Sequence, residues 1–252
     1  MTAMTDIHFH LLPGLDDGPA TMEESLELAT AAVRDGCSTV VATPHVRGDF
    51  VTDVSDLPDR VREVQVALFR EGIPLGVHCG GELGHDMVGR LRQDELQSIA
   101  AGPPRARWLL LETPFEGIGG DFTAATEELR DRGFGVVLAH PERCAGVLDA
   151  DCAAVRHEIA QGSALQVNAS SLAGRHGDEA QAAGTRLLLE KLATVLGSDA
   201  HSMSRAPALT NGLLSATRIG LEPSAAAALV TSAPQRLLTR GLPAPEVAPA
   251  AA

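Results

Sequence analysis

The sequence predicts an α/β protein whose parallel strands close into a barrel. Short apolar runs alternate with amphipathic segments from end to end, which is typical of parallel strands joined by right-handed crossovers. No glycine-rich phosphate loop follows the first run, which disfavours a nucleotide-binding open sheet. A chain of 252 residues is long enough for one large α/β domain. We therefore expect a (β/α) barrel with its active site at the C-terminal ends of the strands.

Seven apolar runs are expected to form the strands of this barrel. They lie at 5–9, 38–42, 74–79, 107–112, 135–139, 164–168 and 193–197. Seven strands are one fewer than the eight of a standard TIM barrel, so the fold expected is a (β/α)7 TIM-like variant.

The segments between these strands carry helix signals. Thr21 and Glu24 have the spacing of a capping box, and Gly36 is the expected stop of the first helix. Similar apolar stripes lead up to Gly72 and Gly133, where two further helices are expected to end. Strand and helix therefore alternate throughout the chain.

Domain organisation is predicted to be simple. We expect a single domain over 1–242, because no linker or repeat interrupts the alternation. The Pro/Ala-rich residues 243–252 show no periodicity and are predicted to form a frayed tail.

Composition excludes several classes of function. The 33 acidic side chains outnumber the 20 basic ones and give a net charge of −13, which disfavours a protein that binds nucleic acid or an anionic membrane. The sequence has no apolar stretch of signal-peptide length and no apolar run of about 18 residues. Its four cysteines are sparse and lack CxxC spacing. We therefore expect a cytoplasmic protein without membrane insertion.

Metal-capable side chains stand at the C-terminal ends of the predicted strands. In the first strand two histidines lie two residues apart, so both imidazoles leave the same face and can share one ion. A single histidine in such a place is more often structural, but a parallel barrel gathers all its strand ends into one pocket. The candidate ligands are His8, His10, Asp17, His45, Glu82, Glu112, His140, Asp199 and His201. The histidines without this placement, expected to be structural or at the surface, are His78, His85, His157 and His176.

Nine ligands are too many for one tetrahedral zinc ion with an open position. They indicate two or three divalent metal ions. Imidazole and carboxylate ligands without thiolate suit manganese, iron or zinc. Clustered ions of this kind activate water and stabilise a departing oxyanion, and both effects accelerate the hydrolysis of phosphoesters or amides.

Arginines next to these ligands favour phosphate chemistry. Arg143 follows His140 by three residues and Arg205 follows His201 by four, so both are placed to overhang the metal pocket. A guanidinium group binds phosphate oxygens in a bidentate fashion. We predict Arg143 and Arg205 as catalytic residues, with Arg47 as a weaker third candidate and surface ion pairing as the alternative for each.

Six motifs, taken together, resemble the PHP (polymerase and histidinol phosphatase) superfamily. They are DIHFHLLPGLDDGP, ATPH, GGEL, ETPF, AHPERC and GSDAHS, and the resemblance runs from about Asp6 to about Arg240. The closest resemblance is to the bacterial manganese-dependent protein-tyrosine phosphatases of the CpsB/YwqE type. The resemblance implies a distorted seven-stranded barrel of the PHP fold with three metal ions, manganese above all.

The resemblance also implies how the ligands are divided among these ions. The first ion would be held by His8, His10, Glu82 and Asp199. Glu82 would bridge to a second ion bound by Glu112 and His140. The third ion would use Asp17, His45 and His201, and Asp17 is preferred to Asp16 because the family aspartate directly precedes a glycine.

The function implied is hydrolysis of protein tyrosine phosphate by a metal-bound hydroxide, linked to the regulation of capsule or exopolysaccharide synthesis. The implied partner is a phosphotyrosine protein, with a polysaccharide-assembly tyrosine kinase as the candidate. Arg143 and Arg205 fall where this family contacts phosphate. Cys144 stands where relatives commonly carry an aromatic residue, and the chain has no tyrosine.

Other functions are also compatible with parts of this sequence. A small-molecule phosphatase of the histidinol-phosphate type fits the same residues. A metal-dependent amidohydrolase ordinarily adds a bridging lysine, and the only lysine, Lys191, lies before the last strand. A structural or regulatory metal module would be expected to have lost ligands that are intact here. A cysteine-dependent phosphatase needs an arginine six residues after its cysteine, and no cysteine has one. The general acid and the oligomeric state are not assigned.

Overall fold

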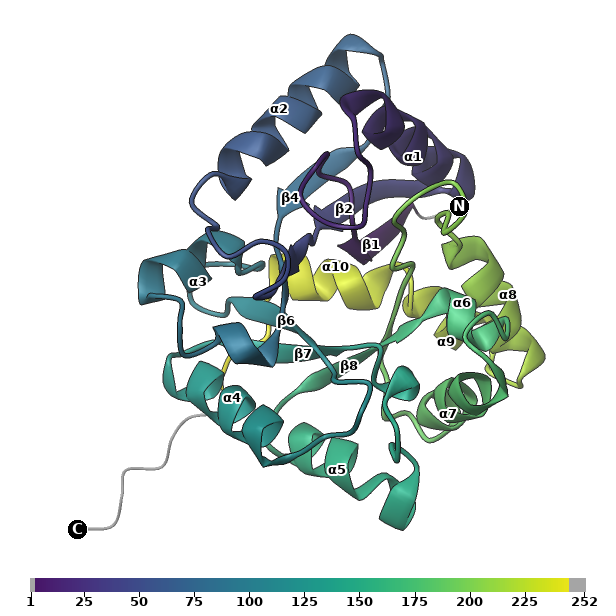
Figure 1. Ribbon diagram of the computed structural model, residues 1–252. Helices are drawn as coiled ribbons and strands as arrows, with labels where there is room; N and C mark the ends of the chain where they lie inside the picture. Colours follow the sequence, from purple (N-terminus) through teal and green to yellow (C-terminus); the bar gives the residue numbers. More distant parts are fainter. Residues whose placement is uncertain (1–2, 245–252) are drawn as a thin grey trace.

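The computed structural model describes residues 3–244 and shows a mixed α/β fold (Figure 1). Within this range every pair of neighbouring strands is parallel, as the alternation of strand and helix predicts. Figure 1 shows the helices arranged around the strands. Of the predicted tail, residues 245–252 lie outside the described residues.

The seven predicted runs all contain strands, and two further strands are very short. The strands are β1 (Met4–Phe9), β2 (Cys37–Ala42), β3 (His45–Val46), β4 (Gly76–Cys79), β5 (Glu82–Leu83), β6 (Trp108–Glu112), β7 (Gly135–Ala139), β8 (Ala164–Asn168) and β9 (Val195–Gly197). Two residues are too few to show a period, so the sequence does not reveal β3 or β5. Each follows a break in the line of the preceding strand, at Pro44 and at Gly80.

The strands form two sheets rather than one. The first has the order β1-β2-β4 and the second has the order β3-β5-β6-β7-β8-β9. At the break before β5, a Cβ atom added to Gly80 would lie 2.5 Å from Cγ1 of Val41, so only glycine lets the two strands approach this closely. The breaks carry the chain from one sheet into the other.

The first and last strands meet at their C-terminal ends. Phe9 and Ala200 form a parallel bridge, and the Asp199 N–H donates to the carbonyl of His8 at 3.0 Å. The N–H of His10 donates to the carbonyl of Ala200 at 2.9 Å. These bonds bring two widely separated parts of the sequence, each carrying candidate ligands, into direct contact.

The helices follow the strands as predicted. They are α1 (Met22–Asp35), α2 (Leu57–Arg70), α3 (Gln93–Ile99), α4 (Gly120–Asp131), α5 (Asp149–Ala160), α6 (Ala169–Leu172), α7 (Asp178–Leu189), α8 (Leu209–Arg218), α9 (Pro223–Ala228) and α10 (Ser232–Thr239), with short 3-10 helices at His85–Met87 and Pro141–Arg143. The predicted cap of α1 is confirmed: Oγ1 of Thr21 accepts from the Glu24 N–H at 3.3 Å, and Gly36 ends the helix with φ of 103°.

Apolar side chains fill the end of the strands opposite the candidate ligands. Ile7, Val137 and Val195 belong to one buried cluster with Leu237 of α10, which crosses the strands in Figure 1. At the start of β6, Nε1 of Trp108 donates to the Leu237 carbonyl at 2.9 Å. Because this end is packed with apolar groups, an open polar site is left for the C-terminal ends of the strands.

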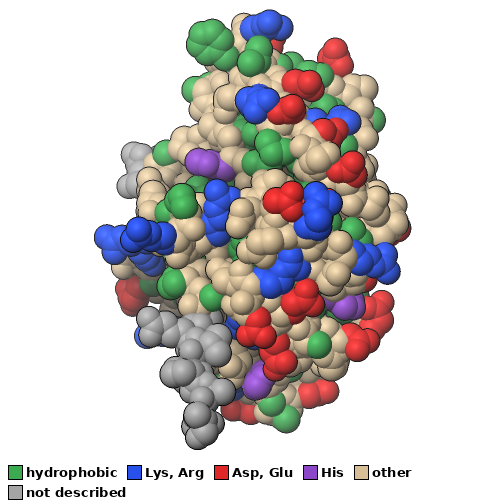
Figure 2. Space-filling model, turned by 90° about the vertical axis from the view of Figure 1, so that its left-hand side faces the viewer, with side chains coloured by type: hydrophobic (Ala, Val, Ile, Leu, Met, Phe, Trp, Pro, Cys, Tyr) green, Lys and Arg blue, Asp and Glu red, His purple; other side chains and the backbone are tan. Residues whose placement is uncertain are grey.

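The outer surface mixes both signs of charge. Figure 2 shows acidic and basic side chains interspersed over one face of the molecule. Some of these side chains form ion pairs with a residue close in sequence. Arg60 of α2, for example, lies 2.7 Å from Asp56, the residue just before this helix. None of the helices between residues 3 and 244 has the length and apolar character needed to cross a bilayer.

One ion pair is buried between α4 and α5. The guanidinium of Arg130 contacts the carboxylate of Glu158 and donates to Oγ of Ser163 at 2.8 Å, and both charged side chains are almost fully buried. Oγ1 of Thr126 also donates to Glu158, at 3.1 Å. The two charges thus neutralise each other inside the protein.

Replacing Glu158 by Ala is expected to cost about 3–5 kcal/mol of stability, because Arg130 keeps a buried charge without a partner. The matched control is Asp56→Ala, which breaks the exposed pair with Arg60 and should cost below about 1 kcal/mol. Urea unfolding of both variants measures the difference. Equal losses of unfolding free energy in the two variants would show that the buried Arg130–Glu158 pair contributes no more stability than the exposed pair.

Candidate metal centre

The structure brings the nine predicted ligands together at the C-terminal ends of the strands. They come from β1 and the loop after it, from β3, β5 and β6, and from the residues just after β7 and β9. Eight of them fall into three groups whose ligand atoms lie within 4.8 Å of one another, and the ninth, His140, contacts Glu82. Parallel strands point all these ends the same way, which explains why residues so far apart in sequence converge.

Glu82 lies at the middle of this cluster. Its Oε2 atom is 3.2 Å from Nε2 of His8, 3.2 Å from Nε2 of His10 and 3.0 Å from Nδ1 of His45. Its Oε1 atom lies 2.8 Å from Nε2 of His140. Although the side chain is fully buried, Oε2 makes no hydrogen bond to any of residues 3–244. A buried carboxylate with one oxygen that three imidazole nitrogens surround without hydrogen bonding suits a ligand shared between cations.

The electrostatics of the cluster also favour cations. Burial opposes a charge on His8, but the carboxylates of Glu82 and Asp199 outweigh burial and raise the His8 pKa to about 9. Burial likewise opposes a charge on His10, yet Asp16 and Glu82 raise its pKa to about 10. The carboxylates thus attract positive charge strongly enough to hold protons on buried imidazoles. Divalent ions bound at the same atoms would supply that charge in place of the protons.

Outer contacts orient the two histidines of β1. Nδ1 of His8 donates to Oε1 of Gln166 at 2.9 Å, and Nδ1 of His10 donates to Oδ2 of Asp16 at 2.7 Å. Each bond leaves the lone pair of Nε2 facing the cluster, as metal-binding imidazoles require. Gln166 was not among the predicted site residues; its only signal is a polar residue within the apolar run 164–168.

The two neighbouring aspartates of the first loop have different positions. Asp16 accepts hydrogen bonds from His10, from the His45 N–H at 2.9 Å and from the Gly18 N–H at 2.9 Å. Asp17 is half exposed and lies 3.1 Å from Nε2 of His201. Asp17 therefore lies in a group of candidate ligands, whereas Asp16 orients His10.

The three groups differ in detail from the division that the resemblance implies. The first group matches it and contains His8, His10, Glu82 and Asp199. The other two groups are His45 with Glu82 and Glu112, and His10 with Asp17, His45 and His201. His10 and His45 therefore each reach two groups, whereas His140 contacts Glu82 without joining the group of Glu112.

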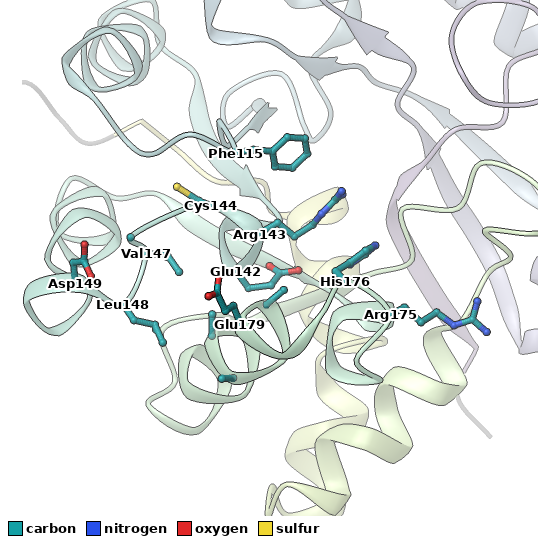
Figure 3. A pocket seen from close by; sticks show the side chains of 14 residues that line it. Phe115, Glu142, Arg143, Cys144, Val147, Leu148, Asp149, Arg175, His176 and Glu179 are labelled. Carbon is teal, nitrogen blue, oxygen red and sulfur yellow. The ribbon is translucent and has the colours of Figure 1, made fainter.

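Two arginines converge on one carboxylate at the edge of the cluster. Nη1 of Arg143 and Nη2 of Arg205 each lie 3.3 Å from Oδ2 of Asp199. Arg205 also lies 3.1 Å from Asp17. The guanidinium of Arg143 stacks on the ring of Phe115, 4.6 Å from its centroid, and Figure 3 shows the two side chains close together. Both predicted phosphate ligands are thus beside the candidate metal ligands.

Arg47, the third arginine candidate, pairs with Glu112 and Asp49. Nη1 of Arg47 lies 3.0 Å and 2.9 Å from the two oxygens of Glu112, and Arg47 also pairs with Asp49 at 2.8 Å. Arg47 thus holds the candidate ligand Glu112 in place. A phosphate contact from Arg47 stays a prediction from the sequence.

Backbone strain occurs at two of the ligands. His140 has φ of 36° and Asp199 has φ of 54°, in the left-handed region that non-glycine residues seldom adopt. His140 precedes the 3-10 helix that carries Arg143, so its conformation turns the chain back beside the cluster. Nothing in the local sequence signals this strain.

Neither the remaining histidines nor the cysteines belong to a ligand group, although His176 lines a cavity beside Asp199. His78 and His157 are exposed and His85 is half-buried, as predicted for structural or surface residues. All four cysteines of the described chain are free. Burial raises the pKa values of Cys79 and Cys144 to about 11, so their thiols are protonated near neutral pH and poorly suited to nucleophilic attack.

The fold and the site together define a class. This is a parallel α/β protein with a candidate cluster of divalent metal ions at its strand ends and two arginines beside the cluster, an arrangement suited to metal-assisted hydrolysis. The chain belongs to the CpsB/CapC family of capsular polysaccharide synthesis, whose model matches residues 4–239.

Individual relatives agree with this assignment. Tyrosine-protein phosphatase YwqE of Bacillus subtilis is 32% identical over 201 residues, which cover 79% of this chain and 78% of the relative. Tyrosine-protein phosphatase CpsB of Streptococcus agalactiae is 29% identical over 172 residues, covering 67% of this chain and 69% of the relative.

Solved structures show the same fold. A crystal structure from work on YwqE of Bacillus subtilis and CpsB of Streptococcus pneumoniae, metal-dependent tyrosine phosphatases, matches with a TM-score of 0.81 and 30% identity, covering 94% of this chain and 95% of that one. A phosphotriesterase homology protein of Escherichia coli matches with a TM-score of 0.61 at 14% identity, covering 93% of this chain and 98% of that one, which is a likeness of fold alone.

Proposed function

We propose that this chain is a metal-dependent protein-tyrosine phosphatase that regulates capsule or exopolysaccharide synthesis. The observation that carries the proposal is the convergence of Arg143 and Arg205 on Asp199, beside three groups of metal-capable side chains. Relatives named tyrosine-protein phosphatase, and the family's link to capsular polysaccharide, support the choice of substrate and setting. The proposed partner is a phosphotyrosine protein, in particular a tyrosine kinase of polysaccharide assembly.

The nine ligands would hold two or three divalent ions, with manganese proposed and iron or zinc also suited to imidazole and carboxylate ligands. When bound, these ions neutralise phosphate charge and lower the pKa of a coordinated water molecule. The protein orients its own ligands for this purpose, because Gln166 and Asp16 hold the His8 and His10 rings with Nε2 inward.

The arginines would bind the phosphate group of the substrate. Arg143 and Arg205 each offer N–H donors next to Asp199, so together they can contact different non-bridging oxygens. Phe115 keeps the Arg143 guanidinium in place by stacking. A phenol has a pKa near 10, so tyrosine needs less help from a general acid on leaving than an aliphatic alcohol would.

We also propose that the two sheets make up one distorted seven-stranded barrel over 1–242. In this count β2 and β3 form one interrupted strand, and β4 and β5 form another, which leaves seven strands. The Phe9–Ala200 bridge joins the first strand to the last. The α10 helix packed against the strands supports this view. A cytoplasmic location stays a prediction from the sequence.

The proposed activity is tested with a substrate panel. Protein reconstituted with manganese is given a phosphotyrosine peptide, a phosphoserine peptide of the same sequence and histidinol phosphate. We expect hydrolysis of the phosphotyrosine peptide, with phosphate release lost on addition of chelator and restored by manganese. Activity that persists in chelator would contradict the metal-dependent reaction. A preference for histidinol phosphate would instead favour a small-molecule phosphatase.

A further inference from the structure

A cavity of about 640 Å³ opens directly beside the candidate metal centre. It lies between the segment 173–177, which follows α6, and the segment 202–208, which follows β9. Asp199, Arg143 and Arg205 form the side of the cavity next to the metal cluster, and Arg175 and His176 belong to its other lining. The cavity therefore continues the site beyond the place where a phosphate group would bind.

The lining of this cavity is positively charged although the chain as a whole has a net charge of −13. Three arginines line it, whereas its only carboxylate is Asp199. That carboxylate already contacts Arg143, Arg205 and the side-chain amide of Asn168. The guanidinium of Arg175, in contrast, makes no ion pair or hydrogen bond to any residue of the described chain. A cation without a partner next to a phosphate site is placed to bind a second anion.

Buried contacts fix the position of the loop that carries Arg175. Oγ of Ser171 donates to Oε1 of the buried Glu142 at 2.7 Å and accepts from Nδ1 of His176 at 2.8 Å. The Arg175 N–H donates to the Ser170 carbonyl at 3.1 Å. Burial and the charge of Arg143 lower the His176 pKa to about 4, so the ring is neutral near pH 7 and keeps Nδ1–H for Ser171.

The side chains of this loop extend in a common direction. Figure 3 shows Arg143, His176 and Arg175 reaching toward the same side, away from Asp149 and Leu148. His176 and Arg175 also line a neighbouring cavity with Arg143, so the three residues stand between the two hollows. His176, predicted to be structural or at the surface, thus helps to hold the loop that carries Arg175 through its contact with Ser171.

We propose that this cavity is a second anion subsite, in which Arg175 binds a negatively charged side chain of the same polypeptide whose phosphotyrosine occupies the metal centre. This inference rests on the proposed phosphatase function. The occupant is a carboxylate or a second phosphate ester, both of which a guanidinium binds through paired N–H donors. The preferred substrates are therefore acidic phosphopeptides. Because Arg175 is exposed, salt weakens the interaction.

The test compares three phosphotyrosine peptides of equal length on manganese-reconstituted protein. One has neutral residues beside the phosphotyrosine, one has glutamates there, and one has a second phosphotyrosine. We expect kcat/KM for at least one anionic peptide to exceed that for the neutral peptide by about tenfold, mainly through KM. Arg175→Ala should remove this preference, and Arg175→Glu should reverse it. The matched control is Arg218→Ala, an exposed arginine on α8 that does not line the cavity.

A binding measurement separates the subsite from catalysis. The same peptides made with a non-hydrolysable phosphonate in place of the phosphate ester should show the same ratio of Kd values, and this ratio should fall as salt is raised. The anionic peptide that binds more tightly than the neutral one identifies the bound anion as a carboxylate or a phosphate. Equal kcat/KM for all three peptides, or a preference that survives in Arg175→Ala, would overturn the subsite. Failure to hydrolyse any phosphotyrosine peptide would instead reject the proposed phosphatase.

Discussion

Replacing Glu82 by Gln is expected to lower kcat for a phosphotyrosine peptide by about 10³-fold, more than the 10- to 100-fold typical of residues that only support metal ligands. The carboxylate lies within 3.2 Å of nitrogen atoms of four histidines and belongs to two of the three ligand groups, so removing its charge affects both of these groups. The amide keeps the size of the side chain but binds a divalent ion less strongly. We therefore also expect less bound metal per chain, measured by elemental analysis.

The matched control for this variant is Glu158→Gln, another fully buried carboxylate, which contacts Arg130 away from the centre. It should retain its metal and its turnover as long as it folds, and circular dichroism with thermal unfolding checks the folding of both proteins. Full metal content together with unchanged kcat in Glu82→Gln would remove Glu82 from the metal centre.

Replacing Arg143 by Ala is expected to reduce kcat by about 10²-fold, the scale seen when one donor to a developing charge is lost. Arg143 lies beside Asp199 at 3.3 Å and is held over Phe115, so its donors stand at the edge of the metal cluster where phosphate would bind. Metal content should stay unchanged, because arginine is not a ligand. Steady-state kinetics with the phosphotyrosine peptide measure the effect.

A second variant distinguishes the shape of the guanidinium from its charge. Arg143→Lys keeps a positive charge but loses the paired donors, so it should recover only part of the lost kcat. Arg218→Ala, on the exposed side of α8, serves as the unaffected control. If Arg143→Ala has wild-type kcat and KM, the arginine is a surface residue and the proposed phosphate contact is wrong.

Much of the fold follows from patterns within short segments. The seven apolar runs all contain strands, and the cap at Thr21 and the stop at Gly36 bound α1 as predicted. The two-residue strands β3 and β5 escape such reasoning, because their pairing depends on neighbouring strands and not on their own period. The division of the strands into two sheets is likewise a matter of long-range contact.

The candidate site likewise divides into features that short sequence patterns predict and features that depend on long-range contacts. Strand direction places the nine ligands at one end, since parallel strands all deliver their C-terminal residues there. Which ligands share a group depends on the direction of each side chain across several strands, so His10 and His45 reach two groups while His140 reaches only Glu82. Gln166, which orients His8, lies on β8, in the other sheet from β1, and carries no motif.

By itself, the sequence determined the parallel α/β class, the identity of the metal-capable residues and the arginines beside them, because side-chain chemistry and position along a strand are local properties. Only the tertiary structure decided that Asp16 orients His10, that Arg47 is held by Glu112, and that a loop after α6 sets Arg175 beside the centre. The Arg47–Glu112 contact and the placing of Arg175 join segments distant in sequence, and the contact of Asp16 with His10 depends on how the loop after β1 folds back, so all three are set by the packing of strands and loops against one another.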